Sequence, residues 1–322
     1  MPVAIVNALI VLPPEIGARM TTLRFDARRI LSLDQPPQRG DTVLDLSGRA
    51  LYPGMINAHD HLELNHYPRS KFRPVYPNAH EWGHDFLPKL AEEPYRTLRK
   101  KPLEEQCNIG GIKNLRSGVT LVAQHNPLHA PLREAEFPIR VLQRYGWAHS
   151  LHFEPKIQRS YRRTPRGAVW MIHLAEGTDA LAAAELRQLQ SLGCLKANTV
   201  LIHGVGLSAE DRQAALEAGA GLIWCPSTNY YLLGATGDVR EFAAARRLAI
   251  GTDSRLTADG DMLDELRAAA KTGQLDVHSL FPAPSLLMQL VCCVCAMSGR
   301  CCPATCLISS SLPPLAIPMP RC

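Results

Sequence analysis

Two histidines separated by one residue, His59 and His61, close an apolar run that has the character of a buried β-strand. Successive side chains of a strand alternate between its two faces, so both imidazoles point the same way while Asp60 points to the other side. A lone histidine is more often a surface or hydrogen-bonded residue. Two of them on one buried face are costly to desolvate unless something binds them, so the pair favours a shared metal ion.

Three further residues of metal-ligating type stand near the ends of other strand-like runs. The runs are Val169–His173, Thr199–His203 and Leu248–Asp253. Residues so far apart in the chain can share one ion only if the strand ends meet, as they do at the C-terminal mouth of a parallel barrel. The sequence therefore predicts a metal centre at such a mouth.

Glu176 follows His173 by three residues. On a continuing strand its carboxylate would face away, so the chain must turn after His173 for Glu176 to reach a water molecule at the metal. A zinc-type ion lowers the pKa of bound water to about 7, and a nearby carboxylic acid can then deliver a proton to a leaving group or ring nitrogen. This predicts a proton shuttle. The alternative is a structural role in which Glu176 adds negative charge at the start of the next helix.

The strand-like runs alternate with helical patterns. Apolar residues recur at helical spacing over Asp179–Leu192, Asp238–Arg247 and Asp261–Lys271, and a capping-box-like start at Ser208–Asp211 predicts a helix that ends near Gly219. Strands alternating with helices of roughly 10–15 residues indicate an α/β protein with a parallel sheet. The number of units favours a (β/α)8 TIM-type barrel over a doubly wound sheet.

Other strands are harder to place. One is expected at Val119–Ala123, one before Cys225, and one near Ile139–Leu142 or Trp147–Phe153. Only about fifteen residues separate Phe153 from the strand that ends at His173, which is short for a full strand-and-helix unit.

The chain divides by composition into three parts. Residues 3–12, 21–33 and 42–52 predict strands of a small N-terminal β unit, a partial β-sandwich over 1–52. The barrel is expected over 53–280. The tail over 281–322 contains no Asp, Glu or Lys and seven of the ten cysteines, and its cysteine spacing does not match a zinc module. We interpret it as a segment encoded out of frame or otherwise not selected for this fold.

Composition excludes several classes of function. The net charge of +5 is mild, and the basic clusters at 96–101 and 159–166 lack interleaved aromatic residues, so no nucleic-acid partner is expected. We expect the cluster at 159–166 to be a solvated surface. The alternative is that it helps to attract an anionic substrate. No signal peptide and no apolar run of about 18 residues is visible, which predicts a cytoplasmic protein without a membrane partner. A small-molecule substrate is expected, and nothing excludes a homo-oligomer.

Five motifs together resemble the amidohydrolase superfamily. The closest branch is the metal-dependent one that holds cytosine deaminase, guanine deaminase and the triazine chlorohydrolases. The resemblance covers about residues 1–275, with the motifs in the family's order. The motifs are His59-Asp60-His61 after Pro53–Asn57, then His173–Gly177, His203-Gly204, Trp224–Asn229 and Gly251–Ser254.

The resemblance implies a role for each matched residue. The ligands of a single Zn²⁺ or Fe²⁺ ion would be His59, His61, His173 and Asp253. Glu176 would be the proton shuttle, Asp253 would also accept a proton from the water, and His203 would orient that water or stabilise the oxyanion. Asn229, in the loop after the strand that ends at Cys225, would shape the substrate pocket; an ordinary turn-forming asparagine is the alternative.

The implied activity is hydrolysis of a carbon–nitrogen bond other than a peptide bond, by deamination of an amino-substituted heterocycle. One alternative is a binuclear cyclic amidohydrolase, which would need a carboxylated lysine on the fourth strand. Lys156 is the candidate there, and Pro155 beside it argues against a regular strand. The other alternative is a truncated, non-catalytic relative, because the tail lacks the closing helix and C-terminal strands of the family. The strands of 1–52 would then have unpaired edges.

Overall fold

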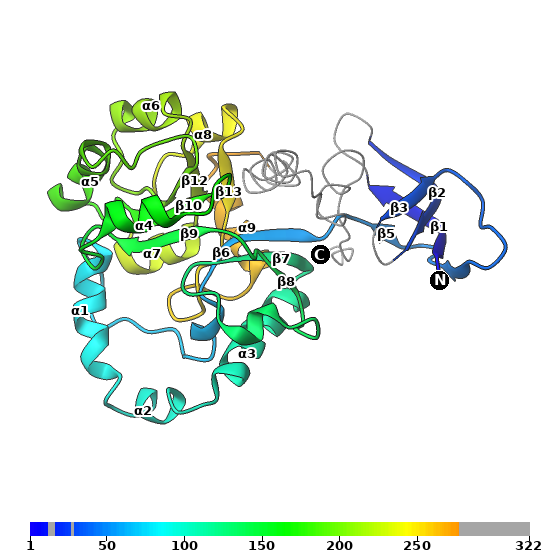
Figure 1. The fold of residues 1–322 in the computed structure, drawn as a ribbon, viewed down its shortest axis with the longest axis horizontal. Coiled ribbons are helices and arrows are strands. Elements are labelled where there is room, and N and C mark those ends of the chain that lie inside the picture. The colour runs from blue at the N-terminus through cyan, green and yellow to red at the C-terminus, as the bar shows by residue number, and fades with distance from the viewer. Residues whose placement is uncertain (12–16, 27–28, 277–322) are drawn as a thin grey trace. The chain divides into compact units, whose positions relative to one another are not determined.

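The structure is a computed structural model, which describes residues 1–11, 17–26 and 29–276. The described chain forms two compact units, with the boundary between Met55 and Ile56. Figure 1 shows the strands and helices of each unit. The expected tail at 281–322 lies outside the described residues.

The N-terminal unit is one five-stranded sheet. Strand β1 pairs antiparallel with β2, which pairs antiparallel with β3, while β4 and β5 both pair parallel with β1. One face carries a small apolar core that contains Ile5, Ala8, Ile10 and Leu51. The strands are β1 (Val3–Val11), β2 (Ala18–Phe25), β3 (Ile30–Leu33), β4 (Thr42–Asp45) and β5 (Ala50–Leu51).

The second unit contains eight strands that are neighbours in chain order. They form a three-stranded sheet, β6-β7-β8, and a five-stranded sheet, β9-β10-β11-β12-β13. The pairs within the larger sheet and the β7–β8 pair are parallel. The strands are β6 (Met55–Asp60), β7 (Val119–Gln124), β8 (Arg140–Val141), β9 (Gly146–Ser150), β10 (Trp170–Leu174), β11 (Thr199–His203), β12 (Gly221–Trp224) and β13 (Leu248–Ile250).

Contacts beyond the strand ladders link the two sheets. The backbone N–H of Asp253, just after β13, donates to the carbonyl of His59 in β6 at 3.0 Å. At the other junction, the His125 ring donates from Nε2 to the carbonyl of Ala148 in β9 at 2.9 Å. The expected α/β class with parallel strands is confirmed, and the end of β6 lies beside the segment that follows β13.

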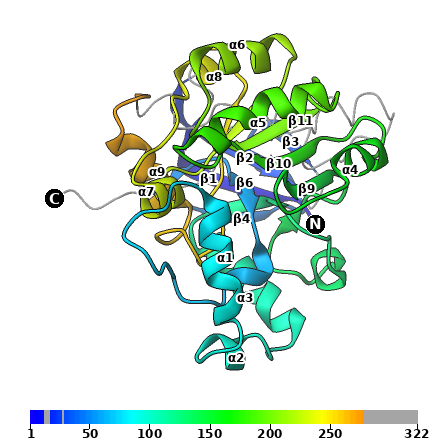
Figure 2. The same ribbon diagram turned by 90° about the vertical axis from the view of Figure 1, so that its left-hand side faces the viewer.

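Helices follow most of the strands, and Figures 1 and 2 show α6 and α8 on the outer side of the larger sheet. Buried apolar side chains such as Trp170, Leu186, Leu222 and Phe242 fill the space between strands and helices. The helices are α1 (Ala79–Lys89), α2 (Tyr95–Leu98), α3 (Leu103–Arg116), α4 (Ile157–Arg163), α5 (Ala180–Ser191), α6 (Ala209–Glu217), α7 (Pro226–Leu233), α8 (Arg240–Ala244) and α9 (Met262–Lys271). The single-turn 3-10 helices are η1 (Leu62–Leu64) and η2 (Ala130–Arg133).

Local sequence signals explain several helix bounds. The expected capping box of α6 is confirmed: Ser208 accepts from the N–H of Asp211, whose carboxylate accepts from the N–H of Ser208. Helix α8 is shorter than the expected Asp238–Arg247, because Arg246 takes a left-handed φ of 56° and stops it. The short connection before β10 holds only α4, a helix of seven residues. Within the described ranges, no helix is long and apolar enough to span a membrane.

Candidate metal centre

The predicted ligands come from the ends of three strands, β6, β10 and β13. His59 lies in β6 with His61 directly after it, His173 lies in β10, and Asp253 lies three residues beyond β13. All four residues are buried. Asp60 points to the opposite side, as strand alternation predicts, and its carboxylate accepts hydrogen bonds from the amides of Asn65 and Asn114.

Their polar atoms converge. Nε2 of His59 lies 3.3 Å from Nε2 of His173 and 3.7 Å from Oδ1 of Asp253. Nε2 of His61 lies 3.6 Å from the same carboxylate oxygen. With Zn–N and Zn–O distances of about 2.0–2.2 Å, neighbouring donor atoms of a tetrahedral zinc site are about 3.3–3.6 Å apart. The three separations are close to that spacing. Ligand atoms of His59, His61 and His173 fall within one group of potential metal ligands and those of His59 and Asp253 within a second, so the two groups share His59.

The protonation of the rings suits metal binding as well. His173 donates from Nδ1 to the carbonyl of His149 at 2.8 Å, which leaves the lone pair of Nε2 facing the centre. Burial, together with the other histidines, holds the pKa of His59 and of His173 well below the ordinary value. Both rings are therefore neutral, the form that binds a metal ion.

A buried ion pair lies next to the candidate metal centre, on the side of β6 to which Asp60 points. Nζ of Lys113, on α3, lies 3.0 Å from Oδ2 of Asp60. The same ammonium donates to Oγ1 of Thr252 at 3.1 Å and to the carbonyl of Asp253 at 3.2 Å. It thus ties the end of β6 to the segment after β13, the two places from which three of the four ligands come.

Glu176 reaches the centre because the chain turns immediately after β10. Ala175 takes a left-handed φ of 53°, and Oε1 of Glu176 lies 3.5 Å from Nε2 of His203. Burial, reinforced by the nearby carboxylates of Asp253 and Glu185, raises the pKa of Glu176 well above its usual value. A glutamic acid that keeps its proton beside the ligands can act as a proton donor.

The alternative role for Glu176, as charge at a helix start, finds little support in the geometry. Helix α5 begins at Ala180, four residues later, and its N-cap is Asp179, whose carboxylate accepts from the N–H of Ala182 at 3.0 Å. Glu176 lies outside the first turn of that helix.

His203 ends β11 and faces both Glu176 and the ligands. Its Nδ1 donates to Oδ1 of Asn229 at 2.9 Å, so in the neutral ring Nε2 is an acceptor. Burial lowers the pKa of His203. His203 also lies with His59 and Asp253 in a group whose ligand atoms are all within 4.8 Å of one another. It is therefore placed to contact whatever the centre binds.

The expected position of Asn229 in a loop is wrong. Asn229 lies inside α7, which begins directly after Cys225 because Pro226 at its first position starts a helix readily. Its amide donates to Oγ1 of Thr236 at 3.0 Å while its carbonyl oxygen accepts from His203. Asn229 is buried and fixes the orientation of the His203 ring.

One residue of the centre was missed by the sequence analysis. His125 directly follows β7, is fully buried, and stacks on His173 with ring centroids 4.2 Å apart. Its Nε2 donates to Ala148, whereas its Nδ1 has no hydrogen-bond partner. Ligand atoms of His125, His59, His61 and His173 all lie within 4.8 Å of one another. The signal was present, because His125 closes an apolar strand just as His173 does.

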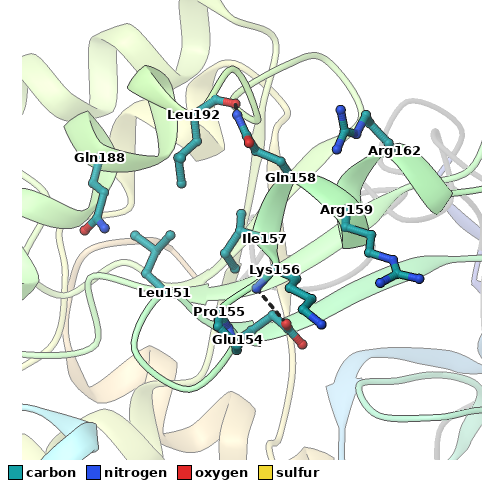
Figure 3. Close-up of a pocket in the computed structure, with 10 residues that line it drawn as sticks. All are labelled: Leu151, Glu154, Pro155, Lys156, Ile157, Gln158, Arg159, Arg162, Gln188 and Leu192. Atoms are coloured by element: carbon teal, nitrogen blue, oxygen red, sulfur yellow. Dashed lines mark hydrogen bonds between the residues drawn. The ribbon is translucent and has the colours of Figure 1, made fainter.

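Lys156, the candidate for a bridging lysine, lies away from the centre. Its side chain is exposed at the N-cap of α4 and lines a surface groove of about 400 Å³ together with Ile157, Arg159 and Leu192 (Figure 3). The basic cluster at 159–166 begins at this groove. The geometry thus gives no support to a lysine-bridged binuclear site.

The fold and the site can be compared with known proteins. The chain is 25% identical to the 5-methylthioadenosine/S-adenosylhomocysteine deaminase of Natronomonas pharaonis, a match that covers 86% of this chain and 75% of that protein. It is 24% identical to the deaminase of the same name from Halobacterium salinarum, covering 81% and 70%. No family model matches the chain.

Solved structures show the same fold. A zinc-bound adenosine deaminase from Xanthomonas campestris superposes with a TM-score of 0.66 at 17% identity, covering 98% of this chain and 82% of that one. The zinc complex of the atrazine chlorohydrolase from Arthrobacter aurescens gives a TM-score of 0.70 at 16% identity, covering 93% and 83%. These comparisons bear out the resemblance to the amidohydrolase superfamily. The sequence resemblance to its deaminase and chlorohydrolase branch is confirmed.

Proposed function

We propose that this amidohydrolase is a metal-dependent enzyme that hydrolyses a carbon–nitrogen bond, deaminating an amino-substituted heterocycle. One observation carries the proposal: the ligand atoms of His59, His61, His173 and Asp253 converge beside Glu176, a buried carboxyl group whose pKa is raised. A general acid next to a set of metal ligands is the arrangement that hydrolytic deamination requires. We assign one Zn²⁺ or Fe²⁺ ion to each chain.

A bound divalent ion would supply a Lewis acid that lowers the pKa of a water molecule to about 7. Water adds to the ring carbon that bears the amino group, and the carboxylate of Asp253 takes up the proton that this water loses. The carboxylic acid of Glu176 gives its proton to the adjacent ring nitrogen. Asp253 then gives its proton to the amino group, which leaves as ammonia, and the hydroxyl proton of the tetrahedral adduct passes to Glu176 as the ring carbonyl forms, so both carboxyl groups return to their starting states.

His203 and its partner position the reacting oxygen. Because Asn229 accepts from Nδ1, the Nε2 atom of His203 is directed toward Glu176 at 3.5 Å. From there it can hydrogen-bond the attacking water or, when protonated, the oxyanion that forms on the ring carbon. The backbone carbonyl of His149 holds the His173 ring in the same way.

For the substrate we propose an adenosine-type nucleoside. The relatives from Natronomonas pharaonis and Halobacterium salinarum are both named for deamination of adenosine derivatives, and a zinc-bound structural neighbour is an adenosine deaminase. In adenine, the carbon that bears the 6-amino group is bonded to a ring nitrogen. Glu176 would protonate that nitrogen, and Asp253 would take the proton of the water that adds to the carbon.

We also propose that the barrel is closed and that the enzyme is cytoplasmic. We take the eight strands as a closed (β/α)8 TIM-type barrel, supported by the backbone hydrogen bond from Asp253 to His59. We place the enzyme in the cytoplasm, where Cys107, Cys194 and Cys225, all free and buried, would stay reduced.

The test is an assay of the purified chain, loaded with Zn²⁺ or Fe²⁺, on adenosine, 5-methylthioadenosine and S-adenosylhomocysteine. Release of ammonia, with the ultraviolet change of an adenine converted to a hypoxanthine ring, is the expected result. A chlorotriazine in a parallel reaction tests for chloride release, which would favour the chlorohydrolase side of the branch. A metal-loaded, folded chain that acts on none of these substrates would favour a non-catalytic relative.

A further inference from the structure

A second group of histidines lies outside the centre described above. His80 and His84 are four residues apart on α1, so they project from the same face of that helix. His152 comes from the segment after β9, and its Nε2 lies 3.0 Å from Nε2 of His84. Both of these side chains are exposed. The catalytic proposal uses neither of them.

The surroundings hold His152 in place. Its ring stacks on His80 with centroids 4.5 Å apart and ring planes 17° apart. His80 in turn is fixed through Nε2, which lies 3.0 Å from Oε1 of Glu185. The Phe153 ring lies edge-on to His152, with centroids 4.7 Å apart. One partner of the His84–His152 pair is thus oriented by its neighbours before any ligand arrives.

Two imidazole nitrogens that face each other can interact in only two ways. Either one of them is protonated and donates to the other, or both direct lone pairs at a shared cation. The separation of 3.0 Å is only a few tenths of an ångström below the spacing of about 3.3–3.4 Å expected for two nitrogens on a tetrahedral zinc ion. Rotation of the exposed His84 side chain can supply the difference.

We propose that His84 and His152 form a second, surface binding site for a divalent transition ion such as Zn²⁺, Ni²⁺ or Cu²⁺. Imidazole nitrogens suit these ions rather than Mg²⁺ or Ca²⁺, and because the site is open, water fills the remaining coordination positions. With two protein ligands, the site holds its ion more weakly than the buried centre does.

An ion at this position would connect α1 with the end of β9. Helix α1 is already joined to the proton shuttle, because the N–H of Ala79 donates to the carbonyl of Glu176 at 2.9 Å. Glu185 bonds both His80 and the N–H of Ala175. The second ion therefore stiffens the segment that carries Glu176 without touching the buried ligands.

Binding of Ni²⁺ to the full chain tests the proposal. The protein carries its first ion, and its cysteines are alkylated with iodoacetamide so that thiols do not bind nickel. Titration calorimetry should show one equivalent of Ni²⁺ that is absent in His84→Ala and in His152→Gln. Lys156→Ala, an exposed cation four residues from His152, is the matched control and should keep it.

Elemental analysis of the same samples measures the first ion separately, so failure of the buried centre is distinguishable from failure of the surface site. Circular dichroism establishes that each variant is folded. The proposal is overturned if the wild-type chain takes up no nickel beyond its first ion, or if the double variant of His84 and His152 takes up as much as wild type.

Discussion

The ammonium of Lys113 and the carboxylate of Asp60 form a buried ion pair, 3.0 Å apart, next to the predicted metal ligands. Asp60 is flanked by the two ligand histidines of β6, and Lys113 bonds the carbonyl of the ligand Asp253. The pair therefore links the ligands of β6 to the ligand that follows β13. Asp60 also accepts hydrogen bonds from the amides of Asn65 and Asn114, and Lys113 also donates to the hydroxyl of Thr252.

Replacing Lys113 by Met should destabilise the protein strongly. The substitution leaves the Asp60 charge buried without its cation, which typically costs about 3–5 kcal/mol. Metal affinity should fall by roughly 10–100-fold, since a group that orients two ligands is lost. Chemical denaturation and metal competition with a chelator measure the two effects. Lys89→Met, which breaks an exposed pair with Glu92, is the control and should cost less than about 1 kcal/mol.

Removing one ligand should empty the centre. His59→Ala and His173→Ala each leave three of the four predicted donors, so we expect loss of the bound ion during gentle purification. Elemental analysis of the purified variants measures this directly. His66→Ala, a partly buried histidine outside the cluster, should retain the ion. Wild-type protein that contains no Zn, Fe, Mn, Co or Ni would refute the assignment.

Glu176→Gln should keep the metal and lose turnover. The amide has nearly the same shape as the carboxylic acid but cannot deliver a proton, so kcat should drop by roughly 10²–10⁴-fold. Because the pKa of Glu176 is raised, wild-type kcat should fall as pH rises through that raised value, and the variant should lack this fall. Glu104→Gln, an exposed substitution, provides the control. A metal-replete Glu176→Gln enzyme with normal rates would show that another group carries the proton.

The sequence predicted that the candidate ligands would lie close together because strand alternation and strand ends determine where those side chains point. His59, His61 and His173 each close an apolar run, and parallel strands bring such ends together. Asn229 was misplaced because a Pro-Ser-Thr run is typical both of a loop and of a helix start. His125 was passed over because a single histidine after a strand is ambiguous until the neighbouring strands are known.

The sequence alone could not predict contacts between residues that lie far apart in the chain. Nothing in the local pattern around Lys113 or His152 indicates a partner, since Asp60 and His84 lie 53 and 68 residues away in the chain. Only the packing of α3 against β6, and of α1 against the segment after β9, creates those contacts. The other contacts that the sequence did not predict also join residues that lie far apart in the chain.

Glu265 should make the protein less stable as pH rises above neutrality. Its carboxyl group is buried on α9, where it bonds the N–H of Ser227 at 2.9 Å and also the Ser227 hydroxyl. Burial raises its pKa from 4.5 to about 8. The folded protein therefore binds a proton that the unfolded chain releases, and the free energy of unfolding falls with pH between those two values.

The difference between wild type and Glu265→Gln over the window from pH 6.5 to pH 8 isolates this effect, because the raised pKa values of Glu176 and His129 act on both proteins. Histidines whose pKa is lowered by burial add stability as pH rises toward about 6.5, the pKa of an unfolded histidine, and contribute a constant amount above it. Over the remaining 1.5 units the Glu265 contribution amounts to about 2 kcal/mol. In urea denaturation at both pH values, the wild type should lose this amount more than Glu265→Gln, whose side chain at position 265 cannot ionise. Parallel pH profiles for the two proteins would mean that Glu265 is ionised in the folded state.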